Sequence, residues 1–414
     1  MKSLITPIAA GLLLAFSQYS LAADTGGYTK TDGGDVSGAV KKTASSMQDI
    51  VNIIEAAKVD ANGKKVKGGA YPLVITYTGN EDSLINAAAA NICGQWSKDA
   101  RGVEIKDFTK GLTIIGANGS SANINAAAAN ICGQWSKDAR GVEIKDFTKG
   151  LTIIGANGSS ANFGIWIVNS SDIVVRNMRI GYLPGGAQDG DMFRIDNSPN
   201  VWLDHNELFA ANHECDGTKD GDTTFESAID IKKGATYVTI SYNYIHGVKK
   251  VGLSGFSSSD TAERNITYHH NIYSDVNARL PLQRGGNVHA YNNLYTGITS
   301  SGLNVRQNGK ALIENNWFEN AVSPVTSRYD GSNFGTWVLK GNNITKPADF
   351  ATYNITWTPD TKEYRNADTW TSTGTYPTVP YSYSPVSAQC VKDKLANYAG
   401  VGKNLATLAS SACK

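Results

Sequence analysis

Two short acidic segments contain the residues best suited to bind a metal ion. Asp189 and Asp191 flank a glycine in the first segment, and Glu226 and Asp230 lie in the second, which ends at Lys232. If the second segment is a strand, its alternation places Glu226, Asp230 and Lys232 on one face. Carboxylate oxygens are hard ligands, and the flexible coordination shell of Ca²⁺ also accepts oxygens from solvent or a bound ligand. An Asp-Gly-Asp segment alone is usually a solvated turn, but combined with an acidic strand face it predicts Ca²⁺ as the cofactor.

Basic side chains follow these carboxylates along the chain. Lys249 and Lys250 come first, and a segment with one proline and two glycines then presents Arg279 and Arg284. Proline fixes a turn, and glycine lets a ligand approach closely. Guanidinium groups recognise carboxylates through a forked geometry. Two surface arginines are the plainer interpretation, but beside the acidic segments they indicate a groove for an acidic ligand.

A strand-like phrase that ends in asparagine recurs through the chain and predicts the scaffold for these residues. Each copy opens with alternating apolar and β-branched residues, as in VWLDHNELF, and then has an asparagine where the chain must bend. The aligned asparagines, at steps of 29, 37, 28, 22, 23 and 27 residues, are Asn177, Asn206, Asn243, Asn271, Asn293, Asn316 and Asn343.

Repeats of this kind are typical of a solenoid, whose coils stack to bury one continuous core. The shortest step approximates a bare coil, and the longer steps leave room for long loops on one side. We therefore predict an all-β fold, a right-handed parallel β-helix with a ladder of stacked asparagines. A turn-rich β-sandwich is the alternative, but seven copies in phase favour the solenoid.

The segment Met47–Lys58 predicts a helix that caps the open N-terminal end of this solenoid. Ser45 and Ser46 precede it as candidate N-caps. Its apolar face carries Ile50, Ile53, Ile54 and Ala57. The first coil needs such a cover because its edge is otherwise apolar and unpaired.

The first 22 residues have the pattern of a cleaved signal peptide, with Lys2 followed by an apolar run that ends at Ala22. We expect a secreted protein, with residues 23–414 forming one β-helix domain. No later stretch approaches the roughly 18 uncharged residues of a membrane span. The formal net charge of +1 is nearly neutral, and we expect no nucleic-acid partner, no membrane association after signal removal, and a monomer.

Residues 85–123 are repeated letter for letter as residues 124–162. The later strand-like repeats share only a pattern, so this exact tandem copy has a different origin. The extra residues could add a whole coil to the solenoid or bulge out from it. Only the second copy runs directly into Phe163.

Export favours disulfide formation among the five cysteines, which are Cys93, Cys132, Cys215, Cys390 and Cys413. Cys390 and Cys413 flank the C-terminal segment, and we expect them to pair. Cys215 then takes one of the two duplicated cysteines, and one thiol is left over. Because the second copy continues into the solenoid, we expect Cys132 to pair with Cys215 and Cys93 to remain free.

The acidic and basic segments, together with Val201-Trp202-Leu203-Asp204-His205, resemble the extracellular pectate lyases of polysaccharide lyase family 1. The resemblance is nearest to the pectate lyase C type of soft-rot bacteria and covers the mature chain apart from the duplication. It implies Ca²⁺-dependent β-elimination of polygalacturonate on a parallel β-helix, giving unsaturated oligogalacturonides. The implied Ca²⁺ ligands are Asp189, Asp191, Glu226 and Asp230. The implied base is Arg279, and the residues implied to hold substrate carboxylates are Lys250, Arg284 and Lys232. Asp204 and His205 are expected to be structural.

Two other functions fit this architecture. A pectin-degrading hydrolase would need paired carboxylates as acid and base, but the chain contains neither an Asp-Asp pair nor a Gly-His-Gly segment. A non-catalytic β-helix would bind uronates without cleaving the polymer. Formation of an unsaturated product distinguishes a lyase from both.

Overall fold

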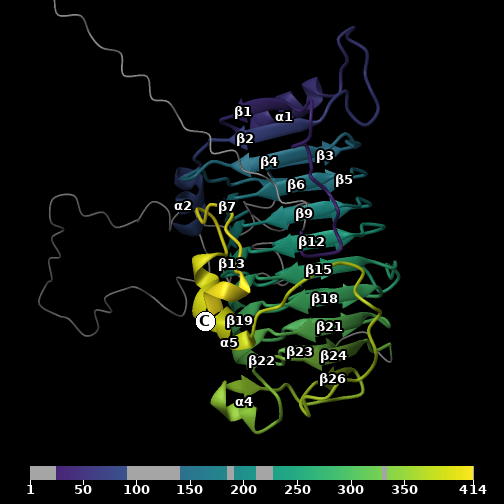
Figure 1. Ribbon diagram of the computed structural model, residues 1–414, viewed down its shortest axis with the longest axis vertical. Helices are drawn as coiled ribbons and strands as arrows, with labels where there is room; N and C mark the ends of the chain where they lie inside the picture. The colour runs from purple at the N-terminus through teal and green to yellow at the C-terminus, as the bar shows by residue number, and fades with distance from the viewer. Residues whose placement is uncertain (1–24, 91–139, 184–190, 211–226, 329–332, 414) are drawn as a thin grey trace, which may run out of the picture.

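Parallel strands stacked along one axis make up most of the structure. The computed structural model describes residues 25–90, 140–183, 191–210, 227–328 and 333–413. Within these ranges the strands form three sheets that extend along the long axis of the molecule (Figure 1). From residue 141 onward, consecutive strands belong to different sheets, and each coil pairs with the coils before and after it. The predicted parallel β-helix is therefore confirmed.

Each sheet takes one strand from successive coils. The ten-stranded sheet contains, in order, β1 (Val40–Ala44), β2 (Leu73–Tyr77), β4 (Leu151–Gly155), β6 (Ile173–Arg176), β9 (Val201–Asp204), β12 (Val238–Ser241), β15 (Asn265–His269), β18 (Asn287–Tyr291), β21 (Lys310–Glu314) and β24 (Thr336–Lys340). The nine-stranded sheet contains β3 (Gly141–Lys145), β5 (Gly164–Val168), β8 (Phe193–Asp196), β11 (Ile229–Lys232), β14 (Gly252–Ser254), β17 (Leu282–Arg284), β20 (Leu303–Arg306), β23 (Val325–Arg328) and β26 (Tyr364–Asn366). The seven-stranded sheet contains β7 (Arg179–Gly181), β10 (Glu207–Phe209), β13 (Tyr244–His246), β16 (Ile272–Val276), β19 (Leu294–Ile298), β22 (Trp317–Val322) and β25 (Ile355–Thr356). Among the described strands, only β23 and β26 pair antiparallel.

Alternation along each strand decides which side chains form the interior. In β11, Ile229 and Ile231 are at most 2% exposed and belong to one continuous apolar core. Burying a side chain of this size contributes roughly 1.5–3 kcal/mol. Asp230 and Lys232 alternate with these isoleucines and therefore lie on the outer face of the sheet.

The predicted asparagine ladder is present inside the solenoid. Each member except the last donates from Nδ2 to Oδ1 of the asparagine in the next coil, at 3.0–3.2 Å, and Asn342 Nδ2 donates to Ile313 O. The members are Asn206, Asn243, Asn271, Asn293, Asn316 and Asn342. All of them are at most 5% exposed, so the ladder satisfies amide groups that would otherwise be buried without partners.

Two predicted members of the ladder are wrong by one residue. The strand register places Arg176 opposite Asp204, so Met178, and not Asn177, lies opposite Asn206. At the other end Glu314 lies opposite Lys340, which brings Asn342, and not Asn343, into line with Asn316. Backbone pairing fixes the register, and adjacent asparagines or a neighbouring apolar residue conceal it in the sequence.

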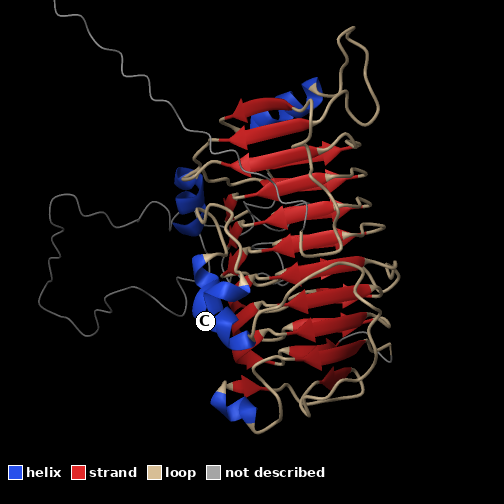
Figure 2. Ribbon diagram, viewed as in Figure 1, coloured by secondary structure: helices blue, strands red, loops and turns tan. Residues whose placement is uncertain are grey.

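Short helices lie at the periphery of the strands (Figure 2). They are α1 (Met47–Ala56), α2 (Asp82–Ala90), α4 (Asp349–Thr352), α5 (Ala388–Lys394) and two 3₁₀ segments, Leu395–Asn397 and Ser410–Cys413. No helix in the described ranges is long and apolar enough to span a membrane.

Helix α1 confirms the predicted N-terminal cap. Ser46 is its N-cap, because Ser46 Oγ accepts a hydrogen bond from Asp49 N and Asp49 Oδ2 accepts one from Ser46 N, both at 3.1 Å. Ile50 and Ile54 are at most 1% exposed and pack into the core, while Ile53 is half-buried. The helix packs beside β1 at the N-terminal end of the solenoid (Figure 1).

The second copy of the duplicated block supplies the strands next to β2. Strand β4 of that copy pairs directly with β2, so within the described ten-stranded sheet no added coil separates them. Glu81, just before the block, accepts hydrogen bonds from Arg140 Nη2 at 2.8 Å and from Asn162 N at 2.7 Å. Residues 85–90 of the first copy belong to α2. The second copy is therefore the one that continues into the solenoid through Phe163, as predicted.

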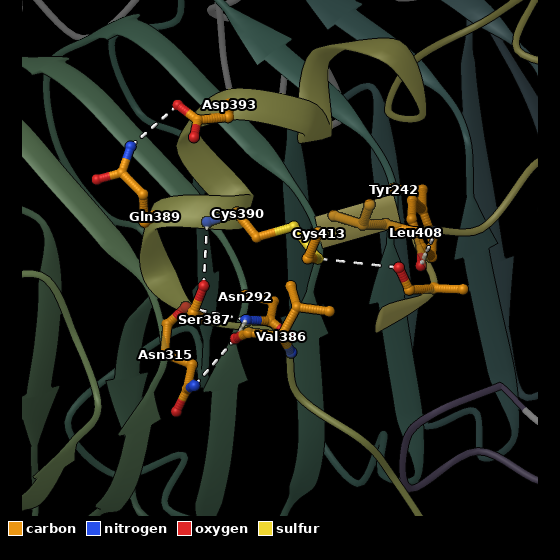
Figure 3. The surroundings of a disulfide bond; sticks show 11 residues. Tyr242, Asn292, Asn315, Val386, Ser387, Gln389, Cys390, Asp393, Leu408 and Cys413 are labelled. Atoms are coloured by element: carbon orange, nitrogen blue, oxygen red, sulfur yellow. Dashed lines mark hydrogen bonds between the residues drawn. A yellow bond between two sulfur atoms is a disulfide. The ribbon is translucent and has the colours of Figure 1, made fainter. Parts of the chain in front are cut away.

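The predicted C-terminal disulfide joins Cys390 to Cys413 (Figure 3). Beside it, Asn292 and Asn315 each donate an Nδ2 hydrogen bond to Val386 O, at 2.7 and 2.9 Å. These contacts fasten the C-terminal segment to the outside of the coils. The other cysteines, Cys93, Cys132 and Cys215, lie outside the described residues, so their pairing remains a prediction.

Candidate functional site

Strands β8 and β11 bring an ammonium group and two carboxylates together on the outer face of the nine-stranded sheet. Lys232 Nζ donates to Asp191 Oδ2 at 2.9 Å and lies 3.0 Å from Asp230 Oδ2. The side chains of Asp191 and Asp230 are 3% and 4% exposed, and that of Lys232 is 19% exposed. Although burial favours the neutral amine, the carboxylates of Asp230 and Asp191 raise the pKa of Lys232 above its usual value. The predicted strand face therefore forms a tight ion cluster.

Asp230 Oδ1 is the atom of this cluster that best fits a bound cation. It is buried and has no hydrogen-bond partner among the described residues. A buried charged oxygen without a partner is costly, and a cation that prefers oxygen ligands would satisfy it.

The described ranges contain only part of the predicted ligand set. Asp189 and Glu226 lie outside them. Within them, no group of three or more His, Cys, Asp or Glu side chains could hold a metal ion. Asp191 and Asp230 are thus the two predicted ligands that the structure brings together.

Arg279 lies one coil away from Lys250. Ala278, the neighbour of Arg279, forms a parallel bridge with Lys250, and Gly252 N donates to Arg279 O at 2.9 Å. The Arg279 guanidinium is half-buried and makes no hydrogen bond or ion pair with any described residue. No described residue therefore occupies its donors.

Arg284 lies in line with Lys232 across the nine-stranded sheet. The register aligns β11 with β14 and β14 with β17, so Lys232, Gly255 and Arg284 occupy equivalent positions in successive coils. Strands about 4.8 Å apart put Lys232 and Arg284 roughly 10 Å apart along the axis. Arg284 Nη1 donates to Gly255 O at 2.7 Å, and a side chain at position 255 would meet Asp260 O at 2.3 Å. Glycine at this position therefore allows the close approach that orients Arg284.

Two charged residues of this surface were not predicted as site residues. Burial and the nearby charges of Lys250 and Arg279 lower the pKa of Lys249, which shows how densely positive charge is gathered here. Arg194 lies on β8 opposite Asp230 and stands 5.5 Å from the ring centre of Trp166. The alternation of Phe193-Arg-Ile-Asp mirrors that of Ile229-Asp-Ile-Lys and could have indicated that Arg194 shares this outer face.

Comparison with known proteins assigns the family. The family model described as Pectate lyase matches residues 1–126 and 113–404. The two matches overlap across the junction between the duplicated copies. Pectate lyase B of Dickeya chrysanthemi is 91% identical over 414 residues, and pectate lyase C of the same organism is 75% identical over 415 residues. Both alignments cover 100% of this chain and of the relative.

Solved structures agree with the sequence matches. Pectate lyase C from Erwinia chrysanthemi, at pH 9.5 with 30 mM Ca²⁺, has a TM-score of 0.83 and 75% identity, covering 95% of this chain and 100% of that chain. A pectate lyase C variant in complex with pentagalacturonic acid has the same values. The chain, with its parallel β-helix and its acidic and basic motifs, therefore belongs to the pectate lyase family.

Proposed function

We propose that this protein is a secreted, Ca²⁺-dependent lyase that cleaves polygalacturonate by β-elimination and releases unsaturated oligogalacturonides. One observation supports the proposal: Arg279, whose guanidinium has no hydrogen-bond or ion-pair partner among the described residues, lies one coil from Lys250 and two coils from the buried carboxylate of Asp230. Neighbouring coils would thus supply a proton acceptor, cations for uronate groups and metal-binding oxygens. The relatives support this reading, since one of them was solved with pentagalacturonic acid and another with Ca²⁺.

The proposed reaction removes the C5 proton of a galacturonate unit and breaks the bond between C4 and the glycosidic oxygen. The electron pair of the C5–H bond becomes the C4–C5 double bond, and the departing oxygen takes a proton from water. Negative charge develops on the C6 carboxylate as the C5 proton leaves, so cations that contact this carboxylate stabilise the transition state. Lys250, Arg284 and Lys232 are the side chains proposed to hold substrate carboxylates.

We propose Arg279 as the group that receives the C5 proton. Guanidinium normally keeps its proton far above neutral pH, so we expect turnover to rise toward alkaline pH. The absence of a described partner for its guanidinium supports this role, because a base must be free to reach its proton.

Asp189, Asp191, Glu226 and Asp230 are proposed to bind Ca²⁺. When bound, the ion would supply positive charge next to the substrate carboxylate. The buried Asp230 Oδ1 supports this assignment. We expect excess EGTA to abolish cleavage and added Ca²⁺ to restore it.

Replacing the proposed base tests the reaction directly. Arg279→Lys keeps the charge but loses the guanidinium fork and its reach, so we expect turnover to fall more than about tenfold, or roughly 1.4 kcal/mol, while substrate binding largely persists. The measurement is the ultraviolet absorbance of the unsaturated product during cleavage of polygalacturonate. Arg284→Lys is the matched control, because it should act mainly on substrate binding. Turnover above a tenth of wild type in Arg279→Lys would exclude Arg279 as the base.

The same assay separates the rival functions. A hydrolase would release reducing ends without an unsaturated product, and a non-catalytic β-helix would bind oligogalacturonate without cleaving it. An unsaturated product excludes both.

Residues 1–22 are proposed to direct export, leaving a monomeric domain of residues 23–414. N-terminal sequencing of the protein from culture medium should begin at Ala23, and size-exclusion chromatography should give one chain. Retention of Met1 on exported protein would contradict the cleavage site.

A further inference from the structure

Lys232 contacts both described carboxylates of the proposed Ca²⁺ site. Its ammonium group contacts one Oδ2 atom of Asp191 and one of Asp230, at 2.9 and 3.0 Å. These carboxylates are the described members of the proposed Ca²⁺ site. In this structure the ammonium of Lys232 therefore supplies positive charge to the carboxylates of Asp191 and Asp230.

Lys232 cannot stay in this position while a metal ion uses the same oxygens. Ca²⁺ is held by oxygens at about 2.3–2.6 Å, and an ion bound to both Oδ2 atoms would need the space that Nζ occupies. Like charges at such short range also repel strongly where water is largely excluded. Asp230 Oδ1 has no described hydrogen-bond partner, and a carboxylate can hold Ca²⁺ through both oxygens, so Asp230 would use Oδ1 together with the Oδ2 atom that the ammonium leaves.

We propose that Lys232 is the internal counter-ion of the metal-free site, and that Ca²⁺ displaces its ammonium, which then binds a substrate carboxylate. The inference rests on the proposed function, because it takes Asp191 and Asp230 as Ca²⁺ ligands. Lys232 thereby couples the two binding events. Free energies of binding are reciprocal, so a substrate that draws Lys232 away also strengthens Ca²⁺ binding by the same factor.

This role gives Lys232 opposite effects on its two ligands. Without substrate, Lys232→Met removes a competitor of Ca²⁺, and we expect Ca²⁺ affinity to rise about tenfold. In saturating Ca²⁺, the same variant lacks a cation for the uronate, and its affinity for a short oligogalacturonate should fall. A residue that served only as a substrate ligand would leave Ca²⁺ affinity in the absence of substrate unchanged.

The next residue provides the matched control. Lys233 has the same charge, and its Nζ donates to Asp196 Oδ2 at 2.9 Å, away from the proposed ligands. Lys233→Met therefore removes one positive charge from the same strand end without freeing Asp191 or Asp230. We expect its Ca²⁺ affinity to stay within about twofold of wild type.

Isothermal titration of the chelator-treated protein with CaCl₂ alone tests the proposal without relying on activity. Circular dichroism and urea unfolding establish that each variant is folded, and Lys232→Gln, which keeps a hydrogen-bond donor, serves as a milder second variant. Tighter Ca²⁺ binding in both Lys232 variants, but not in Lys233→Met, is the expected result. Equal or weaker binding in both overturns the counter-ion role.

Asp230→Asn distinguishes this failure from a failure of the proposed function. If Asp230→Asn weakens Ca²⁺ binding while the Lys232 variants do not strengthen it, the site is correct and only the displacement is wrong. If wild type does not bind Ca²⁺, or Asp230→Asn binds it as wild type does, the proposed Ca²⁺ site and the inference both fail.

Discussion

Asp204 and Asp230 are both aspartates buried on the outer face of a strand, yet their oxygens have very different surroundings. Asp204 Oδ1 accepts a hydrogen bond from Ser241 Oγ at 2.6 Å. Asp204 Oδ2 lies 2.8 Å from His205 Nδ1 and also pairs with Arg176. Asp230 has Lys232 at one oxygen and no described partner at the other. Both oxygens of Asp204 thus have partners within the protein, whereas among the described residues only one oxygen of Asp230 has a partner.

Their positions in the fold agree with this difference. Asp204 lies on the ten-stranded sheet and lines a cavity of about 560 Å³ together with residues from both ends of the chain. His205 Nε2 donates to Ala406 O at 3.0 Å, and His269 Nε2 donates to Thr25 O at 2.7 Å, so this cluster fastens both terminal segments to the coils. Asp230 lies instead beside Lys232 of its own strand and opposite Arg194 of the neighbouring strand. A fully partnered buried carboxylate holds the structure together, whereas an incompletely partnered one is suited to a ligand.

The largest effect on stability is expected at Asp204. Asp204→Asn leaves the buried Arg176 without its counter-charge, and breaking a buried pair in this way costs about 3–5 kcal/mol. Urea unfolding at neutral pH should show this loss with Ca²⁺ or with chelator alike. A loss below roughly 1 kcal/mol would show that the complete set of partners is not what makes Asp204 structural.

The unfolding free energies of wild type and Asp204→Asn should become more similar at low pH. Burial opposes the charge of Asp204, but His205 and Arg176 outweigh it and lower the pKa of Asp204 well below its usual value. The folded-state pKa lies below the unfolded one, near 3.9, so the stabilisation is fully present above about pH 4 and is lost as pH falls further. The difference in unfolding free energy between wild type and Asp204→Asn should therefore shrink below about pH 4.

Asp230→Asn should show the reverse pattern. Lys232 keeps its contact with Asp191 in this variant, so in chelator we expect the unfolding free energy to stay within about 1 kcal/mol of wild type. Ca²⁺ binding should weaken at least tenfold, about 1.4 kcal/mol, because an anionic ligand is lost. The stabilisation that Ca²⁺ gives the folded state should shrink in parallel. Unchanged calcium dependence of activity and stability would remove Asp230 from the proposed site.

Glu314 is a second carboxylate with several partners, and we expect its replacement to reduce stability less than the replacement of Asp204 does. Burial raises its pKa, but His289, Lys340 and Tyr383 outweigh burial and lower the pKa of Glu314 to about 2. Tyr383 Oη donates to Glu314 Oε2 at 2.8 Å, so this carboxylate also fastens the C-terminal segment. Glu314→Gln should reduce stability above about pH 4.5, and the reduction should fade as pH drops toward about 2. Calcium dependence should not change, and a change in it would contradict the distinction between partnered and unpartnered carboxylates.

The stacked coils could be predicted from the sequence, but the exact strand register and the contacts of individual side chains could not. Alternation and asparagine spacing indicated stacked coils, because every coil repeats the same local chemistry, and the capping segment after Ser45 and Ser46 carried its own helical signal. The register could not be predicted to one residue, since Asn342 and Asn343 are adjacent and only backbone pairing selects Asn342. Charged residues of the site were recognisable by type, but the ion cluster of Lys232 depends on distances between separate coils. The difference between Asp204 and Asp230 has the same origin, because Ser241 and Arg176 reach Asp204 from other coils.

Deleting one duplicated copy should have the smallest effect, because neither carboxylate cluster depends on it. Removing residues 91–129 produces the same sequence as removing either copy whole. Strands β2 and β4 already pair directly, and Glu81 already contacts Arg140 and Asn162, so the described coil keeps its contacts. Stacking contacts pass only between neighbouring coils, and both clusters lie after Asn162. We therefore expect calcium-dependent lyase activity within about twofold of the full chain and unchanged stability in urea. A deletion variant that unfolds at lower urea, or that differs from the full chain in Ca²⁺ affinity, would show that the first copy supports the coils that carry Asp204 and Asp230.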